Sequence, residues 1–96
     1  MGNEMVLIGS TIVAAKDQVS CDLAGETAIL SLRNGVYYGL DALGARIWNL
    51  IQEPRQVSQI RDVILEQYEV DAARCEFDLL RLIEELAAQG LVAVSS

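Results

Sequence analysis

The stretch that most constrains the fold is Asn34 to Ile51, NGVYYGLDALGARIWNLI, where a strand pattern passes into a helix pattern with one residue between them. Side chains of 36–40 alternate as in a strand, and from Leu43 onward the apolar residues recur at threes and fours, as in an amphipathic helix. Asp41 stands at the junction, where its carboxylate can accept from the free amides of the first helical turn. The pattern predicts a strand joined directly to a helix, with sheet before this corner and helices after it.

Alternation also predicts the strands that precede the corner. Apolar residues alternate with polar ones over 19–23, and the next strand covers 27–32. Ala24 and Gly25 supply a tight turn between these strands. Asn34 and Gly35 predict a type I′ hairpin turn, because both residue types tolerate positive φ. The result is a three-stranded antiparallel meander in which 36–40 is the edge strand.

Three helices are predicted after the corner, at about 42–53, 57–68 and 72–89. Pro54 prevents continuation of the first helix. Gly90 is expected to end the third helix in the left-handed conformation. The fold class is therefore α+β, with sheet in the first part of the chain and helices in the second.

The length of 96 residues is enough for one hydrophobic core. We expect a flexible N-terminal tail at 1–10 and a single domain at 11–96. Thr11–Ala14 is β-rich and short, so it is either an opening strand or an extended arm. The apolar tail 91–94 is expected to pack in an extended form.

The third predicted helix has three faces rather than two. One apolar face is expected to join the core: Cys75, Leu79, Leu82, Ile83 and Leu86. Charges of opposite sign, spaced by four, three and four, form a stripe: Arg74, Asp78, Arg81 and Glu85. Phe77 and Leu80 lie on the remaining flank, where a second apolar edge predicts a further partner. The alternative is that the stripe is solvated surface and that Phe77 covers the second helix.

Composition argues against several functions. The formal net charge is -7, and ten of the 14 acidic residues follow residue 40, so the helical half repels phosphate backbones and nucleic acid is not expected as a partner. The apolar run 5–15 is interrupted by Gly9, Ser10 and Thr11, so no membrane span is expected. The N-terminus lacks the basic start of a signal peptide, which predicts a cytoplasmic protein.

The chain contains no histidine and two cysteines, Cys21 and Cys75. In a reduced compartment we expect two small buried thiols, with a disulfide as the alternative. Zinc would need further nitrogen or sulfur ligands, so no metal site is expected. Neither thiol has an evident activating partner, which argues against catalysis. No cofactor is expected.

At GVYYGLDALGARIWNLI, VSQIRDVILEQYEVD and LLRLIEELAAQGLV the chain resembles the PqqD family of peptide-binding domains, over roughly residues 18–92. The most similar branch is the stand-alone leader-binding protein of lasso-peptide systems. The likeness rests on an ordered set of residues rather than on one motif: the aromatic strand to Leu40, then Gly44, Ile47 and Trp48, then Glu84, Leu86, Gly90 and Leu91. It implies a winged helix-turn-helix-like domain.

The resemblance further implies a non-catalytic protein that binds the leader segment of a ribosomally made precursor peptide. In the family the leader adds a strand to the sheet edge beside the third helix. That agrees with the residues, because an unpaired edge strand is otherwise an aggregation hazard. The expected peptide site comprises Val36, Tyr37, Tyr38, Gly39, Leu40, Arg74, Phe77, Asp78, Leu80, Arg81 and Glu85.

The resemblance also implies a processing enzyme as a second partner. In a lasso-peptide system this enzyme is a cysteine peptidase that cuts the leader. The alternative is a PqqD-type peptide chaperone that serves a radical enzyme in cofactor biosynthesis. Two rival functions stay open at this point: a DNA-binding winged-helix regulator, and a module that forms a homodimer through the same sheet edge.

Overall fold

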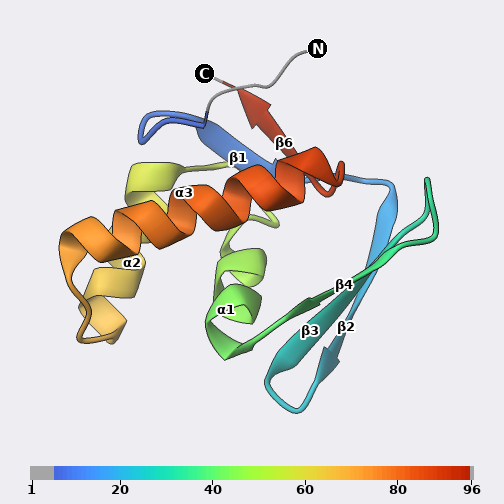
Figure 1. Cartoon of the computed structure of the whole chain (residues 1–96), viewed down its shortest axis with the longest axis horizontal. Helices are drawn as coiled ribbons and strands as arrows, with labels where there is room; N and C mark the ends of the chain where they lie inside the picture. The colour runs from blue at the N-terminus through green and yellow to red at the C-terminus, as the bar shows by residue number, and fades with distance from the viewer. Residues whose placement is uncertain (1–5, 96) are drawn as a thin grey trace.

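The computed structural model describes residues 6–95, which form two small antiparallel sheets and three helices (Figure 1). The predicted α+β class is confirmed. In chain order the elements are β1 (Thr11–Ala14), β2 (Gln18–Leu23), β3 (Glu26–Ser31), β4 (Tyr37–Leu40), α1 (Ala42–Leu50), β5 (Arg55–Gln56), α2 (Val57–Gln67), α3 (Ala72–Ala88) and β6 (Val92–Ser95).

Strands β2, β3 and β4 form the predicted meander, in that spatial order. Cys21 of β2 pairs with Ala28 of β3, and Ala28 pairs in turn with Gly39 of β4. Ile29 and Leu40 are buried on the inner face, which α1 covers, whereas Tyr37 points away from it. The alternation of side chains therefore placed the strands correctly, with β4 at one edge of the sheet.

One of the two predicted hairpin turns is confirmed and the other is not. Ala24 and Gly25 both have positive φ, at 54° and 88°, which is the requirement of a type I′ turn. The type I′ turn predicted for Asn34 and Gly35 is wrong, because only Gly35 has a positive φ, at 72°. The second hairpin instead uses a longer loop.

Three hydrogen bonds define that longer loop. The amide of Ser31 donates to the Val36 carbonyl at 2.9 Å, and the amide of Gly35 donates to the Ser31 carbonyl at 2.8 Å. The Asn34 side-chain oxygen accepts from the Val36 amide at 3.1 Å. This local bond favours the four-residue loop over the two-residue turn, because the side chain supplies the acceptor that the tighter turn would have supplied from the backbone.

The second sheet has the order β5-β1-β6, with β1 in the centre. The strand at Thr11–Ala14 is thus confirmed, and the apolar C-terminal tail forms β6. Residues 6–10 differ from the expected tail: Val6 is buried, and the Ser10 carbonyl accepts from the Val57 amide at 3.0 Å. The expectation for residues 1–5 lies outside the described residues.

The helix boundaries follow capping residues. Asp71 caps α3 through the Arg74 amide at 3.0 Å. At the other end of α3, Gly90 has the predicted left-handed conformation, with a φ of 74°. The amide of Leu91 donates to the Leu86 carbonyl at 2.9 Å, which is the hydrogen bond of a Schellman motif. Helix α1 ends at Leu50, earlier than predicted, because the Ile51 carbonyl accepts from the Ala14 amide of β1 instead of continuing the helix.

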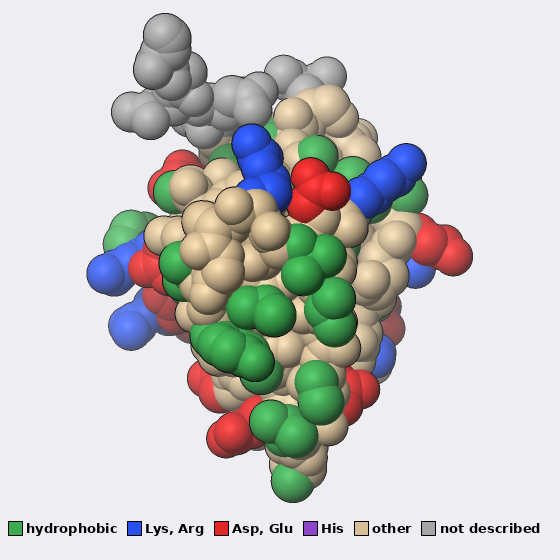
Figure 2. All heavy atoms as spheres, turned by 90° about the vertical axis from the view of Figure 1, so that its right-hand side faces the viewer, with side chains coloured by type: hydrophobic (Ala, Val, Ile, Leu, Met, Phe, Trp, Pro, Cys, Tyr) green, Lys and Arg blue, Asp and Glu red, His purple; other side chains and the backbone are tan. Residues whose placement is uncertain are grey.

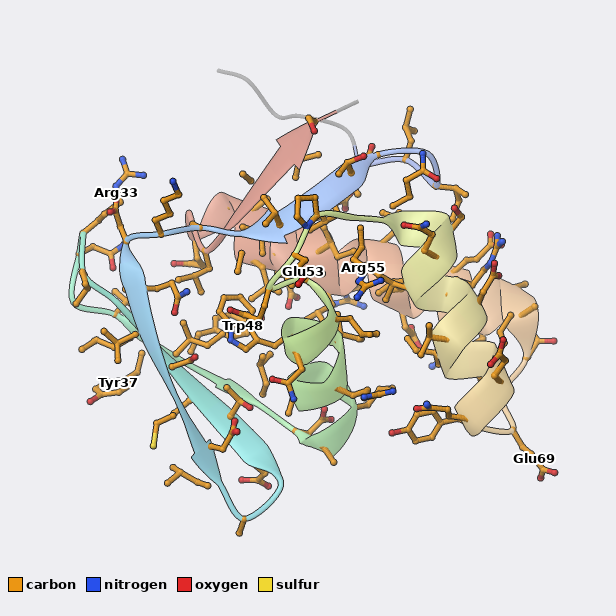
Figure 3. All side chains as sticks on the ribbon, turned by 180° about the vertical axis from the view of Figure 1, so that it is seen from behind. Arg33, Tyr37, Trp48, Glu53, Arg55 and Glu69 are labelled. Carbon is orange, nitrogen blue, oxygen red and sulfur yellow. The ribbon has the colours of Figure 1, made fainter. Side chains whose placement is uncertain are left out.

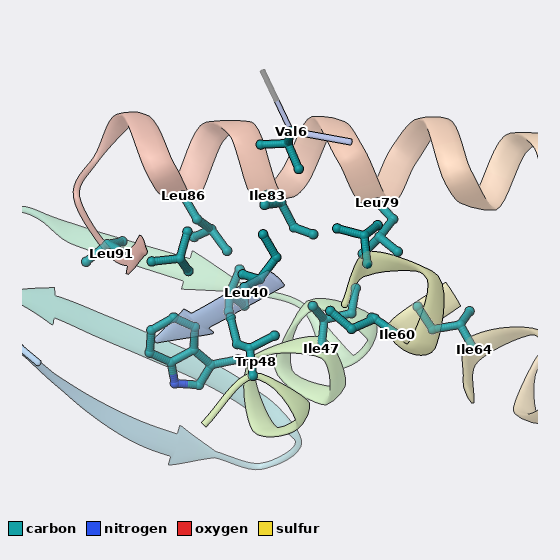
Figure 4. Packing of buried hydrophobic residues seen from close by; sticks show 14 of the residues in the cluster. Val6, Leu40, Ile47, Trp48, Ile60, Ile64, Leu79, Ile83, Leu86 and Leu91 are labelled. Atoms are coloured by element: carbon teal, nitrogen blue, oxygen red, sulfur yellow. The ribbon is translucent and has the colours of Figure 1, made fainter. Parts of the chain in front are cut away.

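The core lies where the three helices meet the inner faces of both sheets (Figure 4). Trp48 is 2% exposed and packs beneath the meander. Ile47 and Leu79 bring α1 and α3 together in the same cluster. Both cysteines are free thiols, but only Cys75 is buried. The expectation that Cys21 is buried is wrong, because Cys21 lies on the outer face of β2, which α1 does not cover.

Candidate functional site

A groove of about 390 Å³ lies between the edge strand β4, the start of α1 and the first half of α3. In Figure 1, helix α3 passes above α1 and β4, and residues of the strand and of the helix line the groove from two sides. The groove is lined by Tyr38, Gly39, Leu40, Asp41, Leu43, Gly44, Ile47, Ile64, Val70, Arg74, Cys75, Asp78, Leu79 and Leu82.

The floor of the groove is apolar and continuous with the core. Leu40 and Leu79 are buried there, and Leu43 of the first α1 turn is 37% exposed at its edge. Gly44 lets α1 approach β4 closely, since an added Cβ would lie 3.1 Å from the Leu40 Cβ. A side chain entering the groove would therefore exchange water for apolar contacts.

The α3 rim of the groove carries an ion pair, and Asp41 at the β4–α1 corner is the other charged residue of the lining. Arg74 Nε and Asp78 Oδ2 lie 3.1 Å apart, and their side chains are 75% and 56% exposed. Such an exposed pair contributes little to stability. Both groups remain accessible to charges on a bound molecule.

The outer edge of β4 opens into the groove. Ser31 and Val36 form a hydrogen-bonded pair, and such pairs alternate along an antiparallel ladder. The backbone groups of Tyr38 and Leu40 therefore face β3, while those of Tyr37 and Gly39 face outward. Within residues 6–95, no strand pairs with this outer side of β4. Two amides and two carbonyls are thus presented to an incoming chain.

One side-chain hydrogen bond connects the two walls. The hydroxyl of Tyr38 on β4 donates to Oε1 of Glu85 on α3 at 2.8 Å. Burial raises the pKa of the Tyr38 hydroxyl, and the hydrogen bond to the Glu85 carboxylate and its negative charge raise it further. The lining of the groove on α3 extends only to Leu82, so this bond marks the end of the groove.

The structure brings together only part of the predicted peptide site. Tyr38, Gly39, Leu40, Arg74 and Asp78 all line the groove. Glu85 does not line the groove but contacts it through its hydrogen bond with Tyr38. Val36 immediately precedes β4 and Tyr37 is the first residue of β4, and both are exposed to solvent.

Three further predicted residues, all on α3, also lie outside the groove lining. Leu80 packs against the core cluster, and it lies about 160° around α3 from Leu82, given 3.6 residues per turn. Phe77 is 61% exposed and Arg81 is exposed, both outside the lining. The structure therefore corrects the prediction that Leu80 lies in the groove wall. The flank of α3 that carries Leu80 turns away from β4.

Sequence reasoning missed most of the apolar lining. The missed residues are Leu43, Gly44, Ile47, Ile64, Val70, Cys75, Leu79 and Leu82. Their helical spacing predicts that they are buried. The spacing is the same for residues that face a core and for residues that face a groove floor, so it does not distinguish the two. The one usable signal was Leu43, an apolar residue in the first turn after the edge strand.

The meander presents a second apolar surface on its outer face. Val19, Leu23 and Tyr37 are 54%, 56% and 71% exposed, and together with Cys21 they form what we call the outer face (Figure 2). Figure 3 shows Tyr37 on this side, whereas Trp48 lies between the sheet and α1. The outer face adjoins the edge of β4 that faces away from β3, because Tyr37 belongs to both.

The described residues contain neither a metal-ligand cluster nor a membrane-spanning helix. Between residues 6 and 95, no three His, Cys, Asp or Glu side chains gather closely enough to hold a metal ion. None of the helices in that part of the chain is both long and apolar enough to cross a bilayer.

Burial raises the pKa of the Cys75 thiol, which lowers its reactivity.

Comparison with known proteins identifies the family. The model of the family described as coenzyme PQQ synthesis protein D (PqqD) matches residues 26–92. A solved structure described as TbiB1 in complex with the TbiA(beta) leader peptide is similar with a TM-score of 0.78 and 36% identity, covering 83% of this chain and 93% of that one. No curated protein gave a significant match. The chain belongs to the PqqD family.

Proposed function

We propose that this protein binds the leader segment of a ribosomally made precursor peptide in the groove beside β4 and delivers the precursor to a processing enzyme. One observation carries the proposal: the edge of β4 that no strand of residues 6–95 pairs with opens directly into an apolar groove. The similar protein TbiB1 has been solved with a leader peptide, which supports the same class of ligand here.

The leader binds as an added strand on β4. Tyr37 and Gly39 offer up to four backbone hydrogen bonds, each contributing roughly 0.5–1.5 kcal/mol. Ordering a flexible peptide costs about 2–5 kcal/mol or more, so these bonds alone give weak binding. Two or three apolar side chains in the groove add about 1.5–3 kcal/mol each. The sum corresponds to a dissociation constant of micromolar order.

The rim charges select among leaders. Arg74 is positioned for a leader carboxylate and Asp78 for a leader lysine or arginine, because both lie at the mouth of the groove and are exposed. Such exposed charges set register and association rate more than affinity. Arg81, outside the lining, acts only on parts of the leader that extend beyond the groove.

Delivery requires a second contact surface, and the outer face meets that need. A protein that only stored a peptide would not need the exposed apolar surface that Val19, Leu23 and Tyr37 form. In a lasso-peptide system the enzyme served is a leader-cutting cysteine peptidase, and in a cofactor pathway it is a radical enzyme. The protein itself is not a catalyst in either case, since it only presents the peptide.

Titration calorimetry with the TbiA(beta) leader peptide as a probe tests leader binding, together with the leader of the precursor encoded nearest this gene. Gly39→Pro removes an outward amide and is expected to lower affinity at least about tenfold. Gly39→Ala is the matched control, because an added Cβ there meets nothing within 4 Å and the amide stays.

The outcomes separate the parts of the proposal. Binding that survives Gly39→Ala and is lost in a folded Gly39→Pro protein supports strand addition. Equal binding by both variants contradicts strand addition but not leader binding. If the wild-type protein binds neither leader, leader binding itself is contradicted.

Self-association is the second candidate, because the outer face and the free edge of β4 would also suit another copy of the chain. Light scattering with and without leader distinguishes the two. A dimer that dissociates as leader is added indicates that both use the β4 edge. A monomer at all concentrations removes this candidate.

A further inference from the structure

We infer that the Tyr38–Glu85 bridge is a specificity element that limits one side chain of the bound peptide to a small residue. The inference rests on the proposed strand addition and concerns which sequences that strand accepts. The bridge is the 2.8 Å hydrogen bond from the Tyr38 hydroxyl to the Glu85 carboxylate.

Strand geometry fixes which peptide side chains enter the groove. Residues directly opposite each other on neighbouring strands point to the same face of a sheet. On β4, Leu40 and Tyr38 face inward, and Gly39 and Tyr37 face outward. The peptide residues opposite Leu40 and Tyr38 therefore point inward, two positions apart.

These two inward positions meet different surroundings. The position opposite Leu40 lies over the apolar floor, which includes Leu43 and Leu79. The position opposite Tyr38 lies where the bridge runs from β4 to α3, and the groove lining ends there. A large apolar side chain therefore fits at the first position. At the second position, the Tyr38 phenol and the Glu85 carboxylate already fill the space.

The bridge is suited to selection because breaking it need not unfold the protein. Glu85 is exposed and the bond is on the surface, so its loss opens space without creating a buried cavity. A large peptide side chain opposite Tyr38 would have to displace Glu85 and leave the Tyr38 hydroxyl without its partner. A small one leaves the bridge intact beneath it.

A peptide scan tests this specificity. Each residue of the TbiA(beta) leader, or of the native leader if that binds more tightly, is replaced in turn by alanine and by leucine, and affinities are measured for wild type, Glu85→Ala and Tyr38→Phe. Glu84→Ala is the matched control, because it removes the same charge from the next, exposed position of α3. Absorbance titration of the tyrosines verifies that the bridge is broken: Glu85→Ala should lower the Tyr38 pKa toward its ordinary value.

The inference predicts one leader position at which leucine binds at least about tenfold more weakly than alanine to the wild type, a size discrimination that apolar pockets can reach. That penalty should fall severalfold in Glu85→Ala, at that position only, and persist in Glu84→Ala. An unchanged penalty in Glu85→Ala, with the Tyr38 pKa lowered, overturns the inference while leader binding stands. If wild type binds no leader, the proposed function fails first.

Discussion

The Asp41 carboxylate accepts a hydrogen bond from the Gly44 amide at 2.9 Å, and this contact joins the edge strand to the first helix through a single residue. Asp41 follows Leu40 directly and caps α1, so the helix starts at the mouth of the groove. The same corner places Leu43 beside β4. The cap therefore positions the part of the groove that α1 contributes.

Removing that cap should cost stability. Asp41→Ala leaves the first-turn amides without their acceptor and is expected to lower the free energy of unfolding by about 1 kcal/mol, within a range of roughly 0.5–2. Asp41→Asn keeps an acceptor oxygen and should lose much less. Urea denaturation followed by circular dichroism measures both. Equal losses in the two variants would mean that charge, and not the cap, matters at this position.

The groove floor and the apolar flank of α3 should differ in their effect on leader binding. Leu43→Ala removes groove contacts and is expected to weaken binding about fivefold to fiftyfold, by the cost of losing part of a buried leucine. Phe77→Ala removes a larger apolar side chain outside the groove and should leave affinity within about twofold. Calorimetry on both variants decides. A larger loss of affinity for Phe77→Ala than for Leu43→Ala would indicate that the leader binds on the opposite side of α3.

The two thiols should react at very different rates. Cys21 is exposed on β2, whereas Cys75 is buried and burial raises its pKa, so less thiolate is present at a given pH. Labelling the native protein with iodoacetamide should modify Cys21 first and Cys75 only after unfolding. Mass spectrometry of Cys21→Ser then reports Cys75 alone. Rapid labelling of that variant would contradict the burial of Cys75.

The Tyr38–Glu85 bond should give a stability contribution that disappears in alkali. Because the folded pKa of Tyr38 is raised above 10.0, the contribution is complete below that pH and is lost as pH rises through the folded value. Wild type should therefore exceed Tyr38→Phe in unfolding free energy at neutral pH, and the difference should shrink above pH 10. Chemical denaturation at several pH values tests this. A pH-independent difference would assign the effect to packing alone.

Much of the fold follows from the sequence because its signals are local. Alternation gives the meander, Asp41 gives the start of α1, and Gly90 gives the end of α3. The second sheet is harder to predict, since β5 has two residues and its strands come from three distant parts of the chain. Long-range pairing of such short segments leaves little periodic trace.

The candidate site is only partly predictable for a related reason. The pattern around Gly39 predicts the edge strand, and the spacing of Arg74 and Asp78 predicts that they share one face of α3. Leu80 and Leu82 are the same residue type on the same helix. Only the position of α3 in the fold decides that Leu82 lines the groove while Leu80 packs against the core. Periodicity gives the faces of a helix but not what each face meets.

Hydrogen exchange at single amides tests strand addition to β4 most directly. The amides of Tyr38 and Leu40 face β3 and should be protected already in the free protein, whereas those of Tyr37 and Gly39 face outward and should exchange rapidly. Saturation with leader peptide, followed by nuclear magnetic resonance, should slow exchange at Tyr37 and Gly39 by at least about tenfold. If the leader binds and these two amides exchange as fast as before, the peptide does not pair with β4 and the proposed mechanism is wrong.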